Sequence, residues 1–210
     1  MKRVCLLMTL VCMMMVSCND GKHEGHEYVD LGLSVKWATC NVGATSPEEY
    51  GDYFAWGETS TKETYYKDNC PTYGLSISQL QSQGYIDSEG NLASQYDAAT
   101  ANWGGKWRMP TNYELGELRD ECIWTWTMQN GVEGCNVKGP SGNSIFLPAA
   151  GSRGVLSLGY AGSNGLYWGS TPTDSSYYGS VYSLYFVSGL QGMDGNYRRD
   201  LGHSVRPVVE

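Results

Sequence analysis

The 210-residue chain is short of basic residues, of proline and of long apolar runs. Its 14 Lys and Arg face 22 Asp and Glu, a net charge of −8. It therefore lacks the basic face on which proteins bind nucleic-acid phosphates, and we expect no nucleic-acid partner. Only 7 prolines accompany 27 Gly, 16 Tyr and 7 Trp, which favours short strands and tight turns over a helix bundle. With 41% hydrophobic residues, the chain has enough apolar material for one core.

Residue patterns of catalysis and metal binding are missing as well. Beyond residue 27 the single histidine is His203, and no G-x-S-x-G, H-E-x-x-H or metal-spaced cysteine pair occurs. Adjacent acids occur at residues 48–49 and 120–121, where a helix start and a solvated helix end explain them better than paired catalytic acids. We therefore predict a protein that is not an enzyme, with no catalytic residues, no metal and no cofactor.

The first 17 residues are typical of a bacterial lipoprotein signal peptide. Lys2 and Arg3 precede an uncharged stretch, residues 4–16, which is too short for a membrane-spanning helix of about 20 residues. The stretch ends in Met-Val-Ser-Cys at residues 15–18, which resembles a lipobox; an ordinary signal peptide with an incidental cysteine is the alternative. We predict removal of residues 1–17 and lipidation of Cys18, whose acyl chains would hold the protein on a membrane.

The residues after the signal peptide form two predicted parts. Residues 18–27 combine the lipidated cysteine with a polar stretch, NDGKHEGHE, that is typical of a solvated tether. His23 and His26 lie in this stretch, but a flexible Gly-containing run lacks the fixed geometry of a metal site. Neither a linker nor a charge block interrupts residues 28–210, so we predict one continuous domain there.

Four cysteines remain in the predicted domain, at Cys40, Cys70, Cys122 and Cys135. They allow three pairings. Asn130 and Gly131 predict a tight type I′ hairpin turn, which places Cys135 opposite Trp126. Cys122 would then lie about 13 Å further along the strand, too far for a disulfide with Cys135. The sequence leaves the other pairings open.

Hydrophobic periodicity and capping signals predict an α+β fold of short strands. Two helices are expected, one beginning at residues 46–49 and one over residues 112–121 after a capping box at Thr111. Residues 69–100 are weakly periodic and are expected to form an insertion with a helical turn or two. Strands are predicted at residues 34–41, 53–56, 123–137 (a hairpin), 144–147, 166–170, 181–187 and 204–209, with the last two paired.

Seven motifs, in order along the chain, resemble the Fibrobacter succinogenes major paralogous domain, a family abundant in lipoproteins of gut Bacteroidota. They are YVDLGL (28–33), KWATCNVGA (36–44), YGDYFAWGE (50–58), WRMPT (107–111), FLPAAG (146–151), YWGS (167–170) and SVRPV (204–208). The resemblance covers residues 27–210 and implies a C-type-lectin-like fold of short, mostly antiparallel strands with one or two amphipathic helices. It also implies an outer-membrane lipoprotein exposed at the cell surface. A shared fold does not by itself imply a shared function.

The resemblance does not extend to the known chemistry of similar folds. Sugar-binding C-type lectins hold calcium with Glu-Pro-Asn or Gln-Pro-Asp and Trp-Asn-Asp tripeptides, which are absent here. The distantly similar formylglycine-generating proteins use two cysteines toward the end of the chain, whereas no cysteine follows Cys135. Neither calcium-dependent sugar binding nor that catalysis is predicted.

The carboxyl-terminal tail has the composition of a recognition surface. Residues 157–203 contain 7 Tyr, 8 Ser and 9 Gly but no Lys or Glu, and Tyr with Ser and Gly provides large, adaptable contacts at low entropy cost. The alternative is a loop-rich β region that needs Gly and Ser for its turns. Within residues 181–187, Tyr185 lies on the strand face opposite Leu184 and Phe186. We predict that a macromolecule or glycan at the cell surface binds a monomer at Tyr167, Trp168, Tyr177, Tyr178, Tyr185, Asn196, Tyr197, Arg198, Asp200 and His203.

Two other interpretations of the tail and the domain stay open. Fixed motifs that alternate with runs of Tyr, Ser, Asn, Asp and Gly resemble the variable regions of receptor proteins diversified by retroelements. A fimbria-associated structural surface protein, assembled by strand donation, would leave few marks in the sequence.

Overall fold

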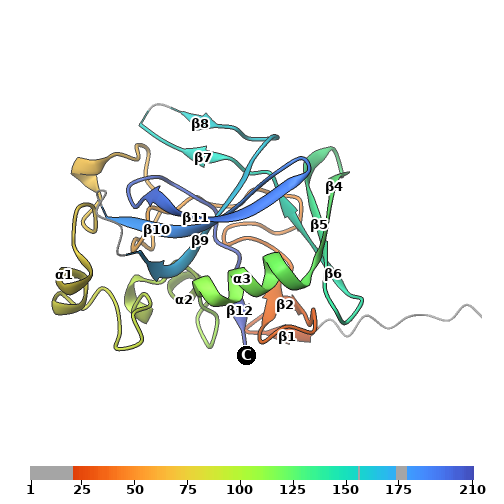
Figure 1. The fold of residues 1–210 in the computed structure, drawn as a ribbon, viewed down its shortest axis with the longest axis horizontal. Coiled ribbons are helices and arrows are strands. Elements are labelled where there is room, and N and C mark those ends of the chain that lie inside the picture. Colours follow the sequence, from red (N-terminus) through yellow and green to blue (C-terminus); the bar gives the residue numbers. More distant parts are fainter. Residues whose placement is uncertain (1–20, 156, 174–178) are drawn as a thin grey trace, which may run out of the picture.

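The structure, a computed structural model, describes residues 21–155, 157–173 and 179–210 and has a mixed α+β fold of mostly antiparallel strands (Figure 1). The helices are η1 (Lys67–Asn69), α1 (Ile77–Ser82), η2 (Ser94–Tyr96), α2 (Ala98–Trp103) and α3 (Asn112–Glu121). The strands are β1 (Gly21–His23), β2 (His26–Val29), β3 (Lys36–Ala38), β4 (Ile123–Gln129), β5 (Val132–Lys138), β6 (Ser144–Pro148), β7 (Ser152–Arg153), β8 (Leu158–Gly159), β9 (Gly165–Pro172), β10 (Ser180–Val187), β11 (Leu190–Arg198) and β12 (Val208–Val209). The predicted α+β class is confirmed. Cys18 and the predicted signal peptide lie outside the described residues.

The strands of the described residues form four sheets, with the orders β1-β2-β3-β12, β11-β10-β9, β4-β5-β6 and β7-β8. The predicted pairing of residues 181–187 with residues 204–209 is wrong, because β10 pairs with β9 and β11, whereas β12 pairs with β3. A tight turn at Gly189, with φ of +80°, folds β11 directly back on β10. The β10–β11 hairpin therefore occupies the edge of β10 with which residues 204–209 were expected to pair.

Helix α3 forms as predicted, over residues 112–121, because its capping box is complete. The Thr111 hydroxyl accepts from the Glu114 N–H at 3.3 Å, and the Glu114 carboxylate accepts from the Thr111 N–H at 2.8 Å. Leu115 and Leu118 are buried on the side of the helix that packs against β9, β10 and β11. Figure 1 shows α3 lying across this sheet.

The β4–β5 hairpin has the predicted register, with Trp126 opposite Cys135. Asn130 and Gly131 have φ of +49° and +85°, as a type I′ turn requires. Cys40, Cys70, Cys122 and Cys135 are all free thiols. The predicted absence of a bridge between Cys122 and Cys135 is therefore confirmed.

We expect thiol reagents to distinguish Cys40 from the other three cysteines. Cys40 is half-buried, whereas the others are buried, and burial raises the pKa of Cys122 to about 11 and of Cys135 to about 12. Since the thiolate is the reactive form, the folded mature domain should be labelled at Cys40 alone by a maleimide at pH 7. In urea all four thiols should react. Rapid labelling of two or more thiols in the folded protein, measured by mass spectrometry, would contradict the structure.

The predicted tether is wrong for residues 21–27, which are folded. Strands β1 and β2 form a hairpin whose register pairs His23 with His26. The His26 ring stacks on Trp103 at 3.8 Å with a 4° interplanar angle, and the Trp107 indole N–H donates to the His23 carbonyl at 2.9 Å. The indoles of Trp103 and Trp107 provide the surface on which the hairpin packs. The polar composition of residues 21–27 does not indicate this contact. Residues 21–27 therefore belong to the folded domain.

The first predicted helix does not form. Residues 46–49 make a turn, and the Glu49 carboxylate accepts from the N–H and hydroxyl of Thr45 at 2.6 and 3.0 Å. The carboxylate that a capping box would use at Ser46 is thus engaged one residue earlier. Residues 53–56 are not a regular strand either, since they contain one isolated bridge, between Phe54 and His203.

The insertion at residues 69–100 contains α1, η2 and the start of α2, which confirms the expected helical turns. Its apolar residues Leu80, Ile86 and Leu92 are buried in one core cluster with Trp56 and Trp168. A second cluster joins α3 to the β4–β5–β6 sheet and to β9 and β10. The insertion is therefore part of the folded domain. In the described part of the chain, none of the helices has the length and apolar character needed to cross a membrane.

Candidate functional site

Four of the predicted ligand-binding residues are in the core, so the prediction is wrong for them. Tyr167, Trp168, Asp200 and His203 are at most 1% exposed. The Tyr167 hydroxyl donates to the Pro148 carbonyl at 2.8 Å and the Trp168 indole donates to the Phe54 carbonyl at 2.7 Å. These polar atoms bind backbone groups of neighbouring segments and cannot reach an external ligand.

His203 is buried rather than solvated at its strand-like position. Its ring stacks on Trp168 at 3.8 Å, Tyr197 meets it edge-on at 5.1 Å, and Nδ1 lies 3.3 Å from the Ser183 hydroxyl. Burial lowers the pKa of His203 to about 3, so the ring is neutral at pH 7. The Ser183–His203 pair is closed to solvent and cannot act on a substrate.

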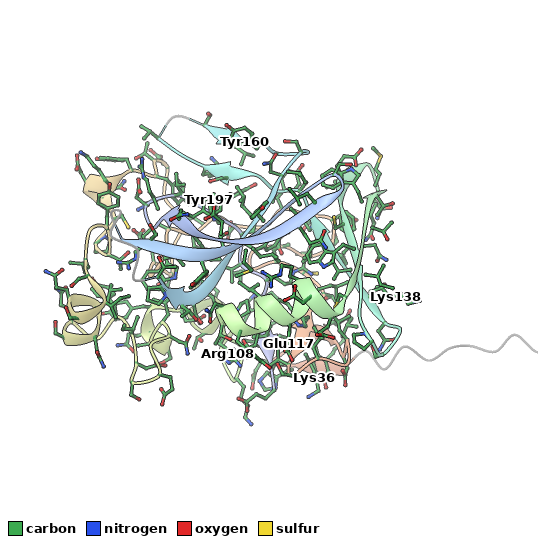
Figure 2. The ribbon with its side chains drawn as sticks, viewed as in Figure 1. Lys36, Arg108, Glu117, Lys138, Tyr160 and Tyr197 are labelled. Atoms are coloured by element: carbon green, nitrogen blue, oxygen red, sulfur yellow. The ribbon has the colours of Figure 1, made fainter. Side chains whose placement is uncertain are left out.

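The other tail residues are only partly exposed. Asn196 and Arg198 are exposed and Tyr185 and Tyr197 are half-buried, and Figure 2 shows Tyr197 on the side of the sheet away from α3. Asn196, Tyr197 and Arg198 belong to β11, so they are part of a regular strand. Arg198 donates to the buried Asp200 carboxylate at 2.9 Å. Tyr177 and Tyr178 lie outside the described residues.

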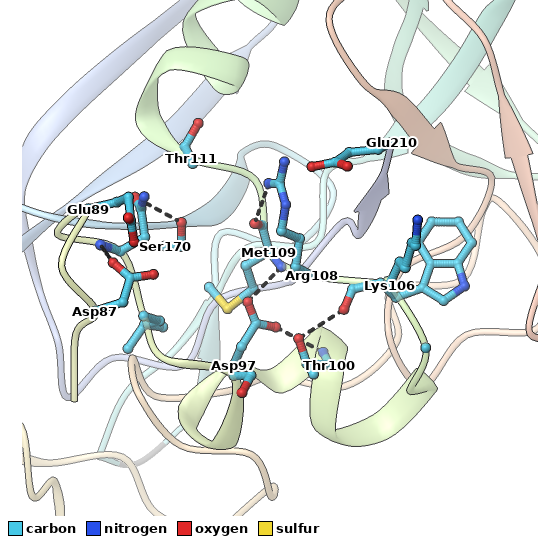
Figure 3. A pocket seen from close by; sticks show the side chains of 15 residues that line it. Asp87, Glu89, Asp97, Thr100, Lys106, Arg108, Met109, Thr111, Ser170 and Glu210 are labelled. Atoms are coloured by element: carbon cyan, nitrogen blue, oxygen red, sulfur yellow. Dashed lines mark hydrogen bonds between the residues drawn. The ribbon is translucent and has the colours of Figure 1, made fainter. Parts of the chain in front are cut away.

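A cleft of about 520 Å³ opens elsewhere, between the insertion, residues 105–111 and the end of β9 (Figure 3). Its volume falls within the range of about 300–1,000 Å³ that is usual for ligand pockets. No sequence pattern predicts this cleft, since the WRMPT motif at residues 107–111 indicates only a family resemblance and a helix start. The residues that line the cleft are mostly charged or hydroxyl-bearing, and they are Asp87, Glu89, Asn91, Leu92, Ser94, Asp97, Thr100, Gly105, Lys106, Trp107, Arg108, Met109, Thr111, Ser170 and Glu210.

The floor of the cleft is held by Asp97. Its carboxylate caps α2 by accepting from the Thr100 N–H at 2.9 Å, and it also accepts from the Met109 N–H at 2.8 Å. Burial raises the pKa of Asp97, although the backbone hydrogen bonds oppose the shift. Because one carboxylate bonds to both segments, α2 and residues 105–111 are held together across the cleft.

One wall is held by an ion pair between Arg108 and Glu114. The guanidinium donates two hydrogen bonds to the carboxylate, at 2.8 and 2.6 Å, in the bidentate geometry that gives the strongest pairs of this kind. Burial opposes ionisation of Glu114, but hydrogen bonds from Arg108 and Thr111 outweigh it and lower the pKa of the carboxyl. Arg108 is thus neutralised within the protein.

The opposite wall is tied to β9 by hydrogen bonds. The Asn91 side-chain oxygen accepts from the Thr171 hydroxyl at 2.6 Å, and the Leu92 N–H donates to the Ser170 carbonyl at 3.0 Å. Ser170 in turn donates its N–H to the Pro110 carbonyl at 2.8 Å. The end of β9 therefore connects the two walls and fixes the width of the cleft.

The rim carries charged side chains that the protein itself does not neutralise. Asp87, Glu89 and Lys106 take part in no ion pair with another described residue. Glu210, by contrast, interacts with Arg108 and helps to raise the pKa of that guanidinium, behind Glu114. In Figure 3 the two acids Asp87 and Glu89 lie on one side, and Lys106 and Glu210 lie on the other. Such groups can exchange water for hydrogen bonds with a polar ligand. The described ranges contain no group of three His, Cys, Asp or Glu side chains placed to hold a metal ion.

Comparison of the chain with protein-family models, with curated proteins and with solved structures finds no match. The family resemblance and the functions inferred below are therefore proposals, supported by the residues themselves.

Proposed function

We propose that this protein is a lipid-anchored outer-membrane protein that binds a glycan at the cell surface, without catalysis, in the cleft bounded by residues 87–97 and 105–111. In this proposal its domain is C-type-lectin-like and belongs to the Fibrobacter succinogenes major paralogous domain family. The observation that carries the proposed function is the combination of a rigid, internally bonded frame with unpaired charges at the rim. A pre-formed site of this kind loses little conformational entropy when a ligand binds.

The chemistry of the cleft favours a hydroxyl-rich ligand. Sugar hydroxyls can donate to the carboxylates of Asp87, Glu89 and Glu210 and accept from the ammonium of Lys106, so one class of ligand satisfies both charges. Acids outnumber bases at the rim, which disfavours a phosphate-rich polyanion. Leu92 and Met109 are the aliphatic lining residues and Trp107 is the aromatic one, so apolar carbon of a sugar ring can also find contacts in the cleft.

The fold also bears on how the anchor would position the domain. The β1–β2 hairpin begins at Gly21, three residues after Cys18. An extended chain covers at most about 3.6 Å per residue, so a lipid at Cys18 would hold the hairpin within about 11 Å of the membrane. The short connection supports a domain that works at the membrane surface rather than on a long stalk.

The exposed part of β11 is the second candidate surface within the same proposed function. Asn196 and Arg198 are exposed there. Part of the Tyr-rich tail is therefore accessible to a ligand. Retroelement diversification of the tail and a fimbria-associated role are the alternative functions.

The test is a glycan array probed with the mature chain from residue 19, which keeps every described helix and strand. A cleft variant combines Asp87→Asn, Glu89→Gln and Lys106→Met, changes that keep side-chain size at exposed or half-buried positions. A tail variant combines Asn196→Ala with Arg198→Lys, which keeps a cation beside the buried Asp200 carboxylate. We expect the cleft variant to lose at least about tenfold in affinity for each glycan that binds, or about 1.4 kcal/mol, and the tail variant to bind as the wild type does.

Three outcomes would contradict this assignment. Equal binding by the cleft variant removes the site from the cleft. Loss of binding in the tail variant alone moves the site to β11. An array on which the wild type binds no glycan overturns the glycan proposal, and retention of the wild-type melting temperature in each variant shows that its result does not come from unfolding.

A further inference from the structure

Strand β4 is an edge strand without the features that usually protect an edge. It pairs with β5 on one side, and no other described strand pairs with it. Proteins commonly block an exposed edge with Lys, Pro or a β-bulge. Strand β4, with the sequence IWTWTMQ, has no charged residue and no proline, and its register with β5 runs without a shift.

The side chains of β4 also suit a contact. Ile123 and Met128 are 68% and 59% exposed, and Thr125 is exposed. Trp124 and Trp126 share a face with Met128, opposite Ile123 and Thr125, and their rings pack against Phe186 at 5.5 and 6.4 Å. The indoles thus anchor the strand to the core. Ile123 and Thr125 are exposed on the opposite face, where Thr127 and Gln129 are half-buried and Gln129 donates to Glu48. The outer edge pairs with no described strand.

The backbone of β4 has a defined pattern of free groups. Gln129 and Val132 flank the two-residue turn, and such a pair exchanges both backbone hydrogen bonds. In an antiparallel ladder, hydrogen-bonded and non-bonded pairs alternate. The N–H and C=O groups of Trp124, Trp126 and Met128 therefore point away from β5, toward solvent.

We propose that β4 pairs with β4 of a second copy of this chain, antiparallel and across a two-fold axis. A register with Trp126 of the two copies opposite each other also places Trp124 of each copy opposite Met128 of the other. All the outward backbone groups then meet complementary groups, and two β4–β5–β6 sheets join into one. A two-fold contact brings each residue near the same residue of the other copy, so a charged residue in β4 would meet a like charge and be repelled. Residues 123–129 contain no charged residue. The dimer replaces the monomer expected from the sequence.

The first test is sedimentation velocity of the mature chain from about 10 µM to about 1 mM. We expect the weight-average mass to rise toward that of a dimer, with a dissociation constant below about 1 mM, because the contact is a single strand pair. The double variant Thr125→Lys/Thr127→Lys should stay monomeric, because the two positions face each other across the axis. The matched control, Ser78→Lys/Gln81→Lys on exposed positions of α1, should associate as the wild type does.

The second test examines the register. Thr125 of one copy lies opposite Thr127 of the other in a non-bonded pair, about 4.5 Å apart at Cα, which suits a disulfide. Two copies of Thr125 lie diagonally, about 7–8 Å apart. Mild oxidation should therefore cross-link an equimolar mixture of Thr125→Cys and Thr127→Cys proteins, and neither variant alone beyond the wild-type background.

Either test can overturn the proposal. A wild-type mass that stays monomeric up to about 1 mM excludes self-pairing of β4. Association that persists in the Thr125→Lys/Thr127→Lys variant places the dimer contact elsewhere. Cross-linking of each single variant as strongly as the mixture excludes the register.

Discussion

Replacement of Arg206 by Met should lower the free energy of unfolding by about 3–5 kcal/mol. Arg206 is 1% exposed, and its guanidinium donates to the Asn41 side-chain oxygen at 2.9 Å, to the Ala38 and Thr39 carbonyls at 3.0 and 2.7 Å, and to the Phe146 carbonyl at 3.0 Å. The variant leaves these acceptors buried without a donor. The guanidinium also joins the end of β3 to β6, so its loss removes the hydrogen bonds that it makes between two sheets.

The measurement is urea unfolding at pH 7, with Arg119→Met as the matched control. Arg119 is one-third exposed and pairs with the adjacent Asp120, so its loss should cost less than about 0.5 kcal/mol. Arg206→Lys should fall between the two, because lysine keeps the charge but lacks the planar fork of donors. A cost below about 1 kcal/mol for Arg206→Met would show that the carbonyls find other donors.

His203 should make the protein acid-sensitive. Burial lowers its pKa to about 3 in the folded protein, whereas an unfolded chain has a His pKa of about 6.5. Because the folded state keeps the ring neutral, stability is complete above about pH 6.5. It falls by up to about 1.4 kcal/mol per pH unit as the pH drops toward 3. The loss at pH 4.5 is therefore up to about 2.7 kcal/mol.

The variant His203→Phe keeps a ring on Trp168 and removes the titration. Wild type and variant should be unfolded in urea at pH 7.0 and at pH 4.5. The wild type should lose about 2–3 kcal/mol more than the variant between the two pH values. The pKa of Glu114 is also lowered in the folded protein, so protonation of Glu114 in acid destabilises the wild type and the variant equally. This effect therefore cancels in the comparison. Equal losses in the two proteins would show that His203 is hydrated or paired.

Features that depend on neighbouring residues could be predicted from the sequence. The capping box at Thr111 and the turn at Asn130–Gly131 each concern atoms a few residues apart, and both form as predicted. The same kind of signal fails at Ser46, because Thr45 competes for the Glu49 carboxylate. Local patterns predict well when no equally close partner competes for the same group.

The tail shows what composition cannot decide. Tyr167 and Trp168 share the residue types of a binding surface with Tyr197, yet the first two are buried and the third is half-buried. Aromatic rings serve cores and surfaces equally well. The difference depends on which segments cover β9 and β10, and these segments are distant in sequence.

The candidate site shows the same limit more strongly. Asp87, Arg108 and Glu210 line one cleft although more than a hundred residues separate the first from the last. Each is an ordinary polar residue in its own segment, and nothing nearby in the sequence marks it. The cleft exists because Asp97 and Ser170 bond the insertion, residues 105–111 and β9 together.

Short-range patterns are enough to predict the α+β class, helix α3, the register of the β4–β5 hairpin and the separation of Cys122 from Cys135. Contacts between distant segments are needed to show that the polar stretch at residues 21–27 is a folded hairpin, that four tail residues belong to the core, and where the cleft lies. Burial and unpaired charge are properties of how distant segments meet, and hydrogen bonds between those segments set them.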